Sequence, residues 1–252
     1  MIISILIILF VSLAGYIVYR IKDLERRYDI GKNQVYYKGW SGYFNRVLEG
    51  ADPNSFEVLK NKFYGKDKNL VFFRGDKIPG ADASSFISVD DLYAKDKSRG
   101  YYNGSPIESS HGASFTVIDN DYSTDGIDIF YGSIPLRVCS KKNFKFIYPT
   151  PDDGDYHYRL YPWATDGCYY YFKNYKIPSD DYQNVQVFKG TNGVAKDKLW
   201  IYYQDHRINY NQKGEKLFDV DVASFTYHDP FVDGGQDKYG CIDGKEGRVK
   251  CE

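Results

Sequence analysis

Six aspartates recur in similar surroundings and are the first residues whose spacing suggests a shared role. Each stands just before a Lys or Gly or in a Lys-Asp-Lys run, with aromatic residues close behind, and the first three follow one another at intervals of 29 residues (67 to 96 and 96 to 125). A catalytic group is needed once per protein, whereas a residue needed once per repeat is structural by default. We therefore predict that they are turn residues whose carboxylates accept backbone N–H bonds. The residues are Asp67, Asp96, Asp125, Asp166, Asp197 and Asp237.

Two acidic loops contain oxygen ligands of the kind that calcium prefers. Residues 121–127 begin like a calcium loop, with side-chain oxygens at the first, third and fifth positions and a Gly at the sixth. The twelfth position is Gly132, where an EF-hand needs a bidentate Glu. Residues 151–155 form the second loop, Pro-Asp-Asp-Gly-Asp. We interpret both as solvated turns and predict no metal or cofactor.

Sequence signatures of catalysis are missing. The histidines His111, His157, His206 and His228 are scattered without ligand spacing, and no C-x₂-C pair suggests zinc. There is no nucleophile elbow, P-loop or dinucleotide fingerprint. Net charge is −1, with 33 basic and 34 acidic residues, which does not suggest a nucleic-acid partner. The sequence therefore predicts a protein that is not an enzyme.

The four cysteines suggest disulfides. Cys241 and Cys251 flank a short Gly-containing turn, which suits a staple across a terminal hairpin. Cys139 and Cys168 are candidates to pair across neighbouring repeats, although sequence does not fix connectivity. Disulfides imply an oxidising compartment.

Three tryptophans, Trp40, Trp163 and Trp200, are the candidate binding-surface residues, because Trp and Tyr favour recognition sites. The stretch 149–163 interrupts the repeat, and irregular loops on a repeat scaffold often bind partners.

The elements that position these residues are short strands in repeats of about 30 residues. Asp67 and Phe86 are 19 residues apart, as are Asp96 and Phe115, whereas the sixth copy reaches Phe225 by a longer route. Alternation over residues 70–73 gives two faces, Gly75-Asp76 supplies a tight turn, and residues 86–89 add a further strand. Such a unit cannot bury its aromatic face alone. We predict an all-β, β-propeller-like repeat domain of six or seven short-stranded blades, with an open β-meander solenoid as the alternative.

The first 30 residues differ from the rest. Residues 2–19 contain no charge, and 18 residues at about 1.5 Å each are long enough to cross a bilayer core. No Lys or Arg precedes this run and no Ala-x-Ala site follows it, which argues against a cleaved signal peptide. We predict a transmembrane anchor (1–19), a helical juxtamembrane stalk (20–30) and the repeat domain (31–252).

Two signals disagree about topology. Arg20, Lys22, Arg26 and Arg27 follow the span, which favours a cytoplasmic domain. The paired cysteines favour the outside of the bacterial inner membrane. We predict a periplasmic repeat domain, with a cytoplasmic one as the alternative.

The repeat resembles that of the DKNYY family of bacterial proteins. The resemblance rests on Asp67-Lys68-Asn69 followed by aromatics, then Ile78-Pro-Gly-Ala-Asp82 and Ser85-Phe86, and it covers residues 28–252, sharply in the first copies and loosely later. It implies an envelope location and no established activity. Tyr16 stands where a lipidated Cys would be, so the span itself is the expected anchor.

These observations lead to three functional hypotheses. The first is a membrane-anchored binding module at the cell envelope that contacts another protein, an immunity-type partner being one form of it. The second is a carbohydrate or cell-wall glycan binder that uses Tyr and Trp faces, and the third and least favoured is an envelope hydrolase. Retention on peptidoglycan separates the second from the first.

Overall fold

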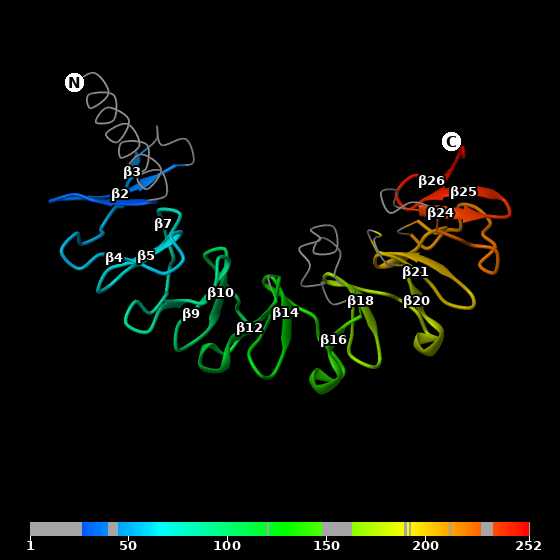
Figure 1. Cartoon of the computed structure of the whole chain (residues 1–252), viewed down its shortest axis with the longest axis horizontal. Coiled ribbons are helices and arrows are strands. Elements are labelled where there is room, and N and C mark those ends of the chain that lie inside the picture. Colours follow the sequence, from blue (N-terminus) through cyan, green and yellow to red (C-terminus); the bar gives the residue numbers. More distant parts are fainter. Residues whose placement is uncertain are drawn as a thin grey trace, which may run out of the picture. The chain divides into compact units, whose positions relative to one another are not determined.

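The computed structural model describes residues 27–39, 45–119, 121–147, 163–188, 191, 193–211, 213–227 and 234–251. By its internal contacts the chain divides into two units, residues 1–126 (unit 1) and 127–252 (unit 2). Each unit consists of short antiparallel sheets that follow one another in sequence order, coloured from blue to red in Figure 1.

The repeat at residues 57–77 illustrates how the sequence forms one sheet. Its four strands are β4 (Glu57–Val58), β5 (Tyr64–Lys66), β6 (Val71–Phe73) and β7 (Asp76–Lys77), paired in that order. Arg74 and Gly75 form the β6–β7 turn with φ of 49° and 81°. Two consecutive residues with positive φ are typical of the type I′ turn, which matches the twist of a hairpin. The tight turn predicted at Gly75-Asp76 lies one residue earlier, because Asp76 already pairs with Phe73.

The remaining sheets of unit 1 repeat this pattern. One sheet contains β1 (Tyr28–Ile30), β2 (Val35–Lys38) and β3 (Asn45–Val47); the sheet after β4–β7 contains β8 (Ile87–Ser88), β9 (Tyr93–Lys95), β10 (Gly100–Tyr102) and β11 (Ser105–Pro106); and β12 (Thr116–Asp119) pairs with β13 (Tyr122–Thr124).

In unit 2 the strands pair in the same up-and-down order. β14 (Ile129–Tyr131) pairs with β15 (Ile134–Pro135); the next sheets are β16 (Lys145–Phe146), β17 (Trp163–Thr165), β18 (Tyr170–Phe172) and β19 (Tyr175–Lys176), then β20 (Gln186–Val187), β21 (Val194–Lys196), β22 (Ile201–Tyr203) and β23 (His206–Arg207), and last β24 (Gly234–Asp237), β25 (Gly240–Asp243) and β26 (Gly247–Val249).

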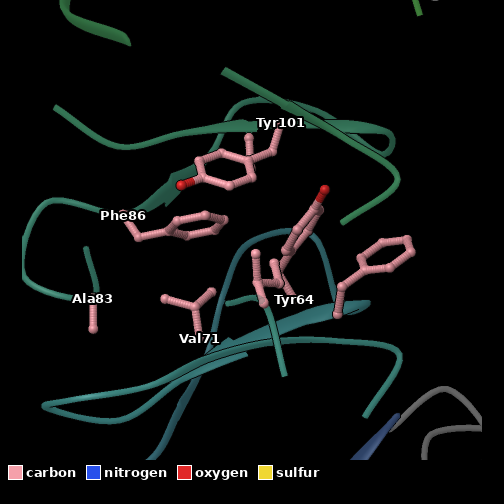
Figure 2. Packing of buried hydrophobic residues seen from close by; sticks show 8 residues of the cluster. Tyr64, Val71, Ala83, Phe86 and Tyr101 are labelled. Carbon is pink, nitrogen blue, oxygen red and sulfur yellow. The ribbon is translucent and has the colours of Figure 1, made fainter. Parts of the chain in front are cut away.

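Aromatic rings between consecutive sheets make up the core. In Figure 2, Tyr64 of the β4–β7 sheet, Phe86 of the connecting turn and Tyr101 of the next sheet lie together, and all three are fully buried. Ring centroids are 5.6 Å apart for Tyr64 and Phe86 and 5.1 Å for Phe86 and Tyr101. Tilted pairs at this distance add about 1 kcal/mol each to area burial. One sheet therefore depends on the next for its core.

The structure confirms the all-β prediction and the further strand of each repeat. Closure into a propeller-like ring concerns how the two units are arranged and stays a prediction.

The predicted stalk is wrong at its C-terminal end. Residues 28–30 form β1, paired with residues 35–37, instead of continuing a helix. The reason is the Tyr28 ring, which is buried with its centroid 5.2 Å from that of Tyr37 and 5.3 Å from that of Phe56. The predicted anchor (1–19) and stalk residues 20–26 lie outside the described residues. Among the residues that are described, no helix is long and apolar enough to cross a membrane.

Turn glycines also join the sheets, which gives a test of the repeat packing. Gly104 and Gly80 have φ of 77° and 73°, but only at Gly104 does an added Cβ meet another sheet, at 2.6 Å from Phe73. We expect Gly104→Ala to lower the free energy of unfolding by about 2–3 kcal/mol, because left-handed strain and overpacking add. Gly80→Ala, the matched control, is expected to cost about 1 kcal/mol from strain alone. Urea unfolding of the full chain in detergent measures both; equal losses would contradict the packing described here.

Candidate functional site

Asp96 shows what the recurring aspartates do. Its Oδ1 accepts the backbone N–H of Ser98 (2.7 Å) and of Arg99 (2.9 Å), which closes its own turn. Its Oδ2 accepts the backbone N–H of Asp82 (3.0 Å), in the connection that leads out of the preceding sheet, and the Tyr101 hydroxyl (2.6 Å). One buried carboxylate therefore closes a turn and joins two consecutive repeats. We call this arrangement the aspartate joint.

The aspartate joint recurs in both units. Turn N–H groups two and three residues ahead bond the same carboxylate oxygen in several copies, and a group from the preceding repeat bonds the other oxygen. These donors from the preceding repeat are the backbone N–H of Asp52 to Asp67, His111 to Asp125, Cys139 to Asp166 and Asp221 to Asp237, and the Ser179 hydroxyl to Asp197. The prediction that these carboxylates accept backbone N–H bonds is confirmed.

A fourth contact distinguishes the joints. Tyrosine hydroxyls five residues ahead donate to three of the aspartates, Asp96, Asp166 and Asp197. Phe72 and Phe130 stand at the same place after Asp67 and Asp125. The joint thus tolerates the loss of this hydroxyl where other contacts hold the carboxylate.

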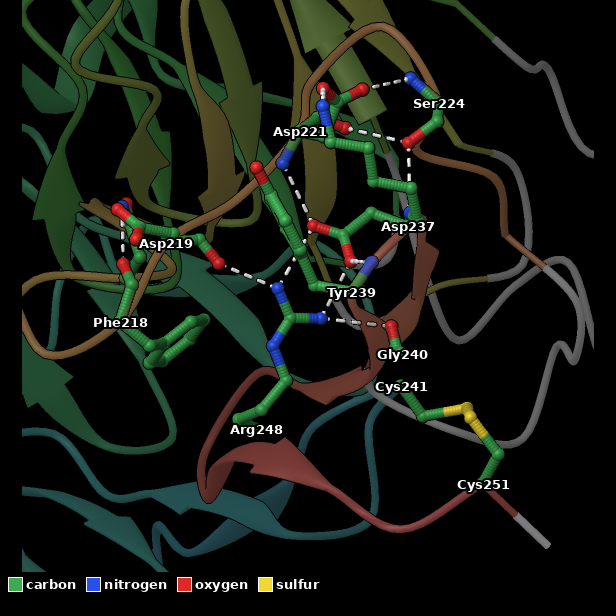
Figure 3. A network of polar contacts seen from close by, with 12 residues as sticks. Phe218, Asp219, Asp221, Ser224, Asp237, Tyr239, Gly240, Cys241, Arg248 and Cys251 are labelled. Atoms are coloured by element: carbon green, nitrogen blue, oxygen red, sulfur yellow. Dashed lines mark hydrogen bonds and ion pairs between the residues drawn. A yellow bond between two sulfur atoms is a disulfide. The ribbon is translucent and has the colours of Figure 1, made fainter.

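The last joint has an arginine instead (Figure 3). Arg248 makes a bidentate pair with Asp237, with Nη1 to Oδ1 at 2.6 Å and Nη2 to Oδ2 at 2.9 Å. The same guanidinium donates to the carbonyl oxygens of Gly240 (2.8 Å) and Asp219 (2.6 Å). Fork-to-fork pairing of this kind is strong and directional, so it fixes the C-terminal sheet onto the segment before it.

The carboxylates of Asp96 and Asp197 each accept four hydrogen bonds, and the pKa of both is lowered. Burial acts to raise the pKa of Asp96, but the Tyr101 hydroxyl and the three N–H donors outweigh it and lower the pKa. The balance is the same for Asp197 with Ser179 and Tyr202. In the partner, burial first and the Asp96 carboxylate second raise the pKa of Tyr101, which therefore stays a donor. A carboxylate in this state is unsuited to proton transfer near neutral pH.

Both predicted disulfides are present. Cys139–Cys168 lies at the Asp166 joint, and the backbone N–H groups of both cysteines donate to that carboxylate (2.7 and 2.9 Å). At the Asp96 joint, the contact beside the carboxylate is a surface ion pair instead of a disulfide, between Asp82 and Lys97 (2.8 Å). The bridge closes a loop of 29 residues, which stabilises a fold by about 3–4 kcal/mol. Exposed ion pairs contribute far less.

The second bridge, Cys241–Cys251, staples the β25–β26 hairpin at the C-terminus, as predicted (Figure 3).

The sulfurs of Cys139 and Cys168 lie within 4.8 Å of an Asp166 carboxylate oxygen, a grouping that resembles a metal site. The two sulfurs are bonded to each other, and Asp166 accepts bonds on both of its oxygens. This cluster is therefore a covalent joint and offers no ready ligand set.

The first calcium-like loop is not the solvated turn that was predicted, because its Ser123 and Asp125 side chains are buried. Asp125, in the first calcium-like loop, accepts the backbone N–H of His111 (3.0 Å) and lies 2.9 Å from its Nδ1. Ser110 precedes His111 in the chain, as a nucleophile next to a base would. Its hydroxyl donates to the Ile107 carbonyl and accepts the Gly100 N–H. Adjacent Ser110 and His111 thus do not form a nucleophile–base pair. Residues 151–155, His157 and His228 lie outside the described residues.

The three tryptophans have different fates. Trp40 lies outside the described residues. Trp163 is fully buried and its Nε1 donates to the Phe188 carbonyl (3.2 Å), so its assignment to a binding surface is wrong. It stands three residues before Asp166, as the buried Tyr93 stands before Asp96, and this register is the signal that would have placed it in the core. Trp200 is half-buried and remains a candidate.

Around Trp200 the structure adds residues that sequence reasoning did not single out. The Arg207 guanidinium lies over the Trp200 ring at 4.0 Å from its centroid, and the Tyr210 ring meets Trp200 edge-on at 5.7 Å. Arg207 is the last residue of β23, and Tyr210 begins the longer connection of the sixth copy. Asp197 and Phe225 are 28 residues apart, against 19 for Asp67 and Phe86, and this excess was the available signal.

A hollow of about 660 Å³ lies beside this cluster, wholly within unit 2. It is lined by Asp205 and His206, by Tyr210, Leu217 and Phe218 of the long connection, and by the turn 244–247 of the stapled hairpin. Leu217 is 60 % exposed at this hollow. We call this arrangement the C-terminal hollow; its lining contains both apolar and polar side chains.

Comparison with known proteins identifies one family. The model described as the DKNYY family matches residues 28–159. No curated protein and no solved structure matches the chain.

The aspartate joint predicts a stability difference between two carboxylates. We expect Asp96→Asn to lower the free energy of unfolding by about 2–3 kcal/mol, because a buried amide replaces a charged acceptor and one of its N–H groups must face another donor. Asp76→Asn is the matched control: that side chain is 75 % exposed in an ion pair with Arg46, so the expected loss is small.

Denaturant unfolding of the full chain in detergent compares the two variants with the natural protein. Equal stability of the two variants would show that Asp96 does not hold the joint.

Proposed function

This chain belongs to the DKNYY family, and from that premise we propose that it is a membrane-anchored binding module of the bacterial cell envelope that contacts another protein through the C-terminal hollow. The proposed role is binding without enzymatic activity. It includes residues 2–19 as the anchor in the inner membrane and a propeller-like closure of the repeats.

The single observation that supports binding most strongly is the composition of the surface beside the hollow. Trp200, Arg207 and Tyr210 belong to the three residue types enriched where protein interfaces derive most of their affinity. Stacking of Arg207 on Trp200 holds both side chains in place before a partner arrives, which lowers the entropy lost on binding. The two flanking segments are the long connection and the stapled turn, which leave the repeat pattern.

The repeat scaffold itself supports a binding role over a catalytic one. Its recurring carboxylates, tyrosines and lysines are used to join sheets: the Lys66 ammonium, for example, donates to the carbonyls of Ala83 (3.0 Å) and Phe86 (2.9 Å) in the connection to the next sheet. A scaffold of this kind presents loops rigidly, which is how repeat proteins bind.

The two disulfides support a periplasmic domain, because such bridges persist in oxidising compartments. The basic residues after the predicted span support the cytoplasmic alternative.

We favour a protein partner over a glycan because Arg207 stacks on Trp200. A sugar platform needs an open aromatic face, and one face of Trp200 is covered by Arg207. An immunity-type role remains one form of the protein-binding proposal.

Photo-cross-linking in intact cells tests this proposal. A cross-linking amino acid at Leu217, beside the hollow, is expected to give an adduct of discrete mass with an envelope protein. The matched control is Ile134, which is 47 % exposed in the same unit but away from the hollow. Arg207→Ala is expected to weaken the Leu217 adduct about tenfold, since truncating a central arginine typically costs more than 1 kcal/mol of binding.

The same adducts from both positions, or none from Leu217, would contradict the proposal. An adduct removed by muramidase would favour the glycan hypothesis, and an adduct with a cytoplasmic protein would reverse the topology.

A further inference from the structure

Three arginines converge at the N-terminal end of unit 1. The guanidinium of Arg74 lies over two rings, 4.9 Å from the Phe63 centroid and 5.0 Å from the Phe73 centroid. Arg27 lies over the Phe63 ring at 5.5 Å. Arg46 donates to the backbone carbonyl of Arg74 (3.0 Å), which places the Arg46 guanidinium beside the chain at Arg74. We call these residues the arginine cluster.

The cluster is rigid and carries excess positive charge. Cation–π contacts hold Arg27 and Arg74 against buried or half-buried rings, so little side-chain freedom remains to be lost on binding. Arg46 forms an ion pair with Asp76 (2.8 Å), and Arg46 and Arg74 are both exposed. Burial raises the pKa of the nearby Tyr37, and all three guanidinium groups oppose that rise. This field of positive charge is the kind that attracts an anion.

Arginine chemistry indicates which anion. A guanidinium presents its donors in a planar fork that matches the oxygens of a phosphate, and it keeps its charge at any physiological pH. Several guanidinium groups on one face suit a surface of many phosphates better than a single buried ligand.

The position of the cluster in the chain indicates the source of the phosphates. Eight residue steps separate Tyr19, at the end of the predicted span, from Arg27. Even a fully extended chain of this length reaches no farther than about 29 Å. If residues 2–19 cross a membrane, the cluster is therefore tethered close to its headgroups, and each arginine near an anionic surface gains about fivefold in occupancy.

We propose that the arginine cluster docks unit 1 onto anionic lipid headgroups, each guanidinium binding lipid phosphate. The inference rests on the proposed membrane anchor. Docking at this end gives unit 1 a defined orientation on the bilayer, whereas a tether alone leaves it free to rotate.

Chemical protection of the natural sequence tests the docking without any destabilising variant. The full chain is reconstituted in nanodiscs of phosphatidylcholine alone or mixed with phosphatidylglycerol, and phenylglyoxal modification of each arginine is followed by mass spectrometry. We expect Arg46 and Arg74 to react about fivefold more slowly in the anionic nanodiscs, and high salt to remove the protection. Arg137, exposed in unit 2, is the internal control and is expected to react equally in both.

The other outcomes overturn the proposal. Equal rates for Arg46 and Arg74 in the two nanodiscs exclude lipid docking. The same protection by inorganic phosphate in phosphatidylcholine nanodiscs would show a general phosphate site instead.

Failure of the anchor is a separate result. A chain that does not co-purify with phosphatidylcholine nanodiscs lacks the membrane anchor. Reaction of that chain with added phosphatidylglycerol vesicles then decides the docking: protection of Arg46 and Arg74 upholds it, and unchanged rates exclude it.

Discussion

The carboxylate shared between consecutive repeats is the interaction on which the other features depend. Strands of two to four residues cannot form an independent sheet, and each sheet leaves an aromatic face that only its neighbour covers. The aspartate joint sets the spacing at which that covering happens, because a single buried charge such as Asp96 must receive donors from both repeats at once. An unpaired buried carboxylate is costly, so the two repeats form together or the joint fails.

This constraint explains why the central aspartate recurs while the contacts around it differ from one joint to the next. The same place holds an ion pair at Asp82 and Lys97, a histidine at His111 and a disulfide at Cys139. Each of these contacts lies beside a carboxylate that already has its hydrogen-bond donors. Each therefore changes the stability of the joint without changing the spacing of the two repeats. The scaffold is thereby free to carry irregular segments, and the features assigned to function, the C-terminal hollow and the arginine cluster, lie where the repeat departs from its pattern or begins.

Much of this was predictable from residue types at fixed spacing. The aromatic alternation and the turn aspartates followed from the sequence, because each depends on neighbours within one or two repeats. The cysteine pairs were candidates whose connectivity the structure supplied. The joint itself was not predictable, since at most joints the donor in the preceding repeat is a backbone N–H, which Asp, His and Cys supply alike. Trp163 was misplaced because tryptophan was treated by type and not by its register before Asp166. The stalk failed at Tyr28, whose ring is buried by residues distant in sequence.

The most direct test of the joint is the pH dependence of the stability lost in Asp96→Asn. The pKa of Asp96 is lowered in the folded chain, so its contribution is fully present above the unfolded value near 3.8 and is lost as the pH falls through the lower folded value. Unfolding of the full chain and of the variant, measured in detergent from neutral to strongly acidic pH, should give a constant difference above about pH 5 that shrinks below about pH 4. A difference that stays constant into strong acid would mean that the carboxylate charge does not hold the repeats together.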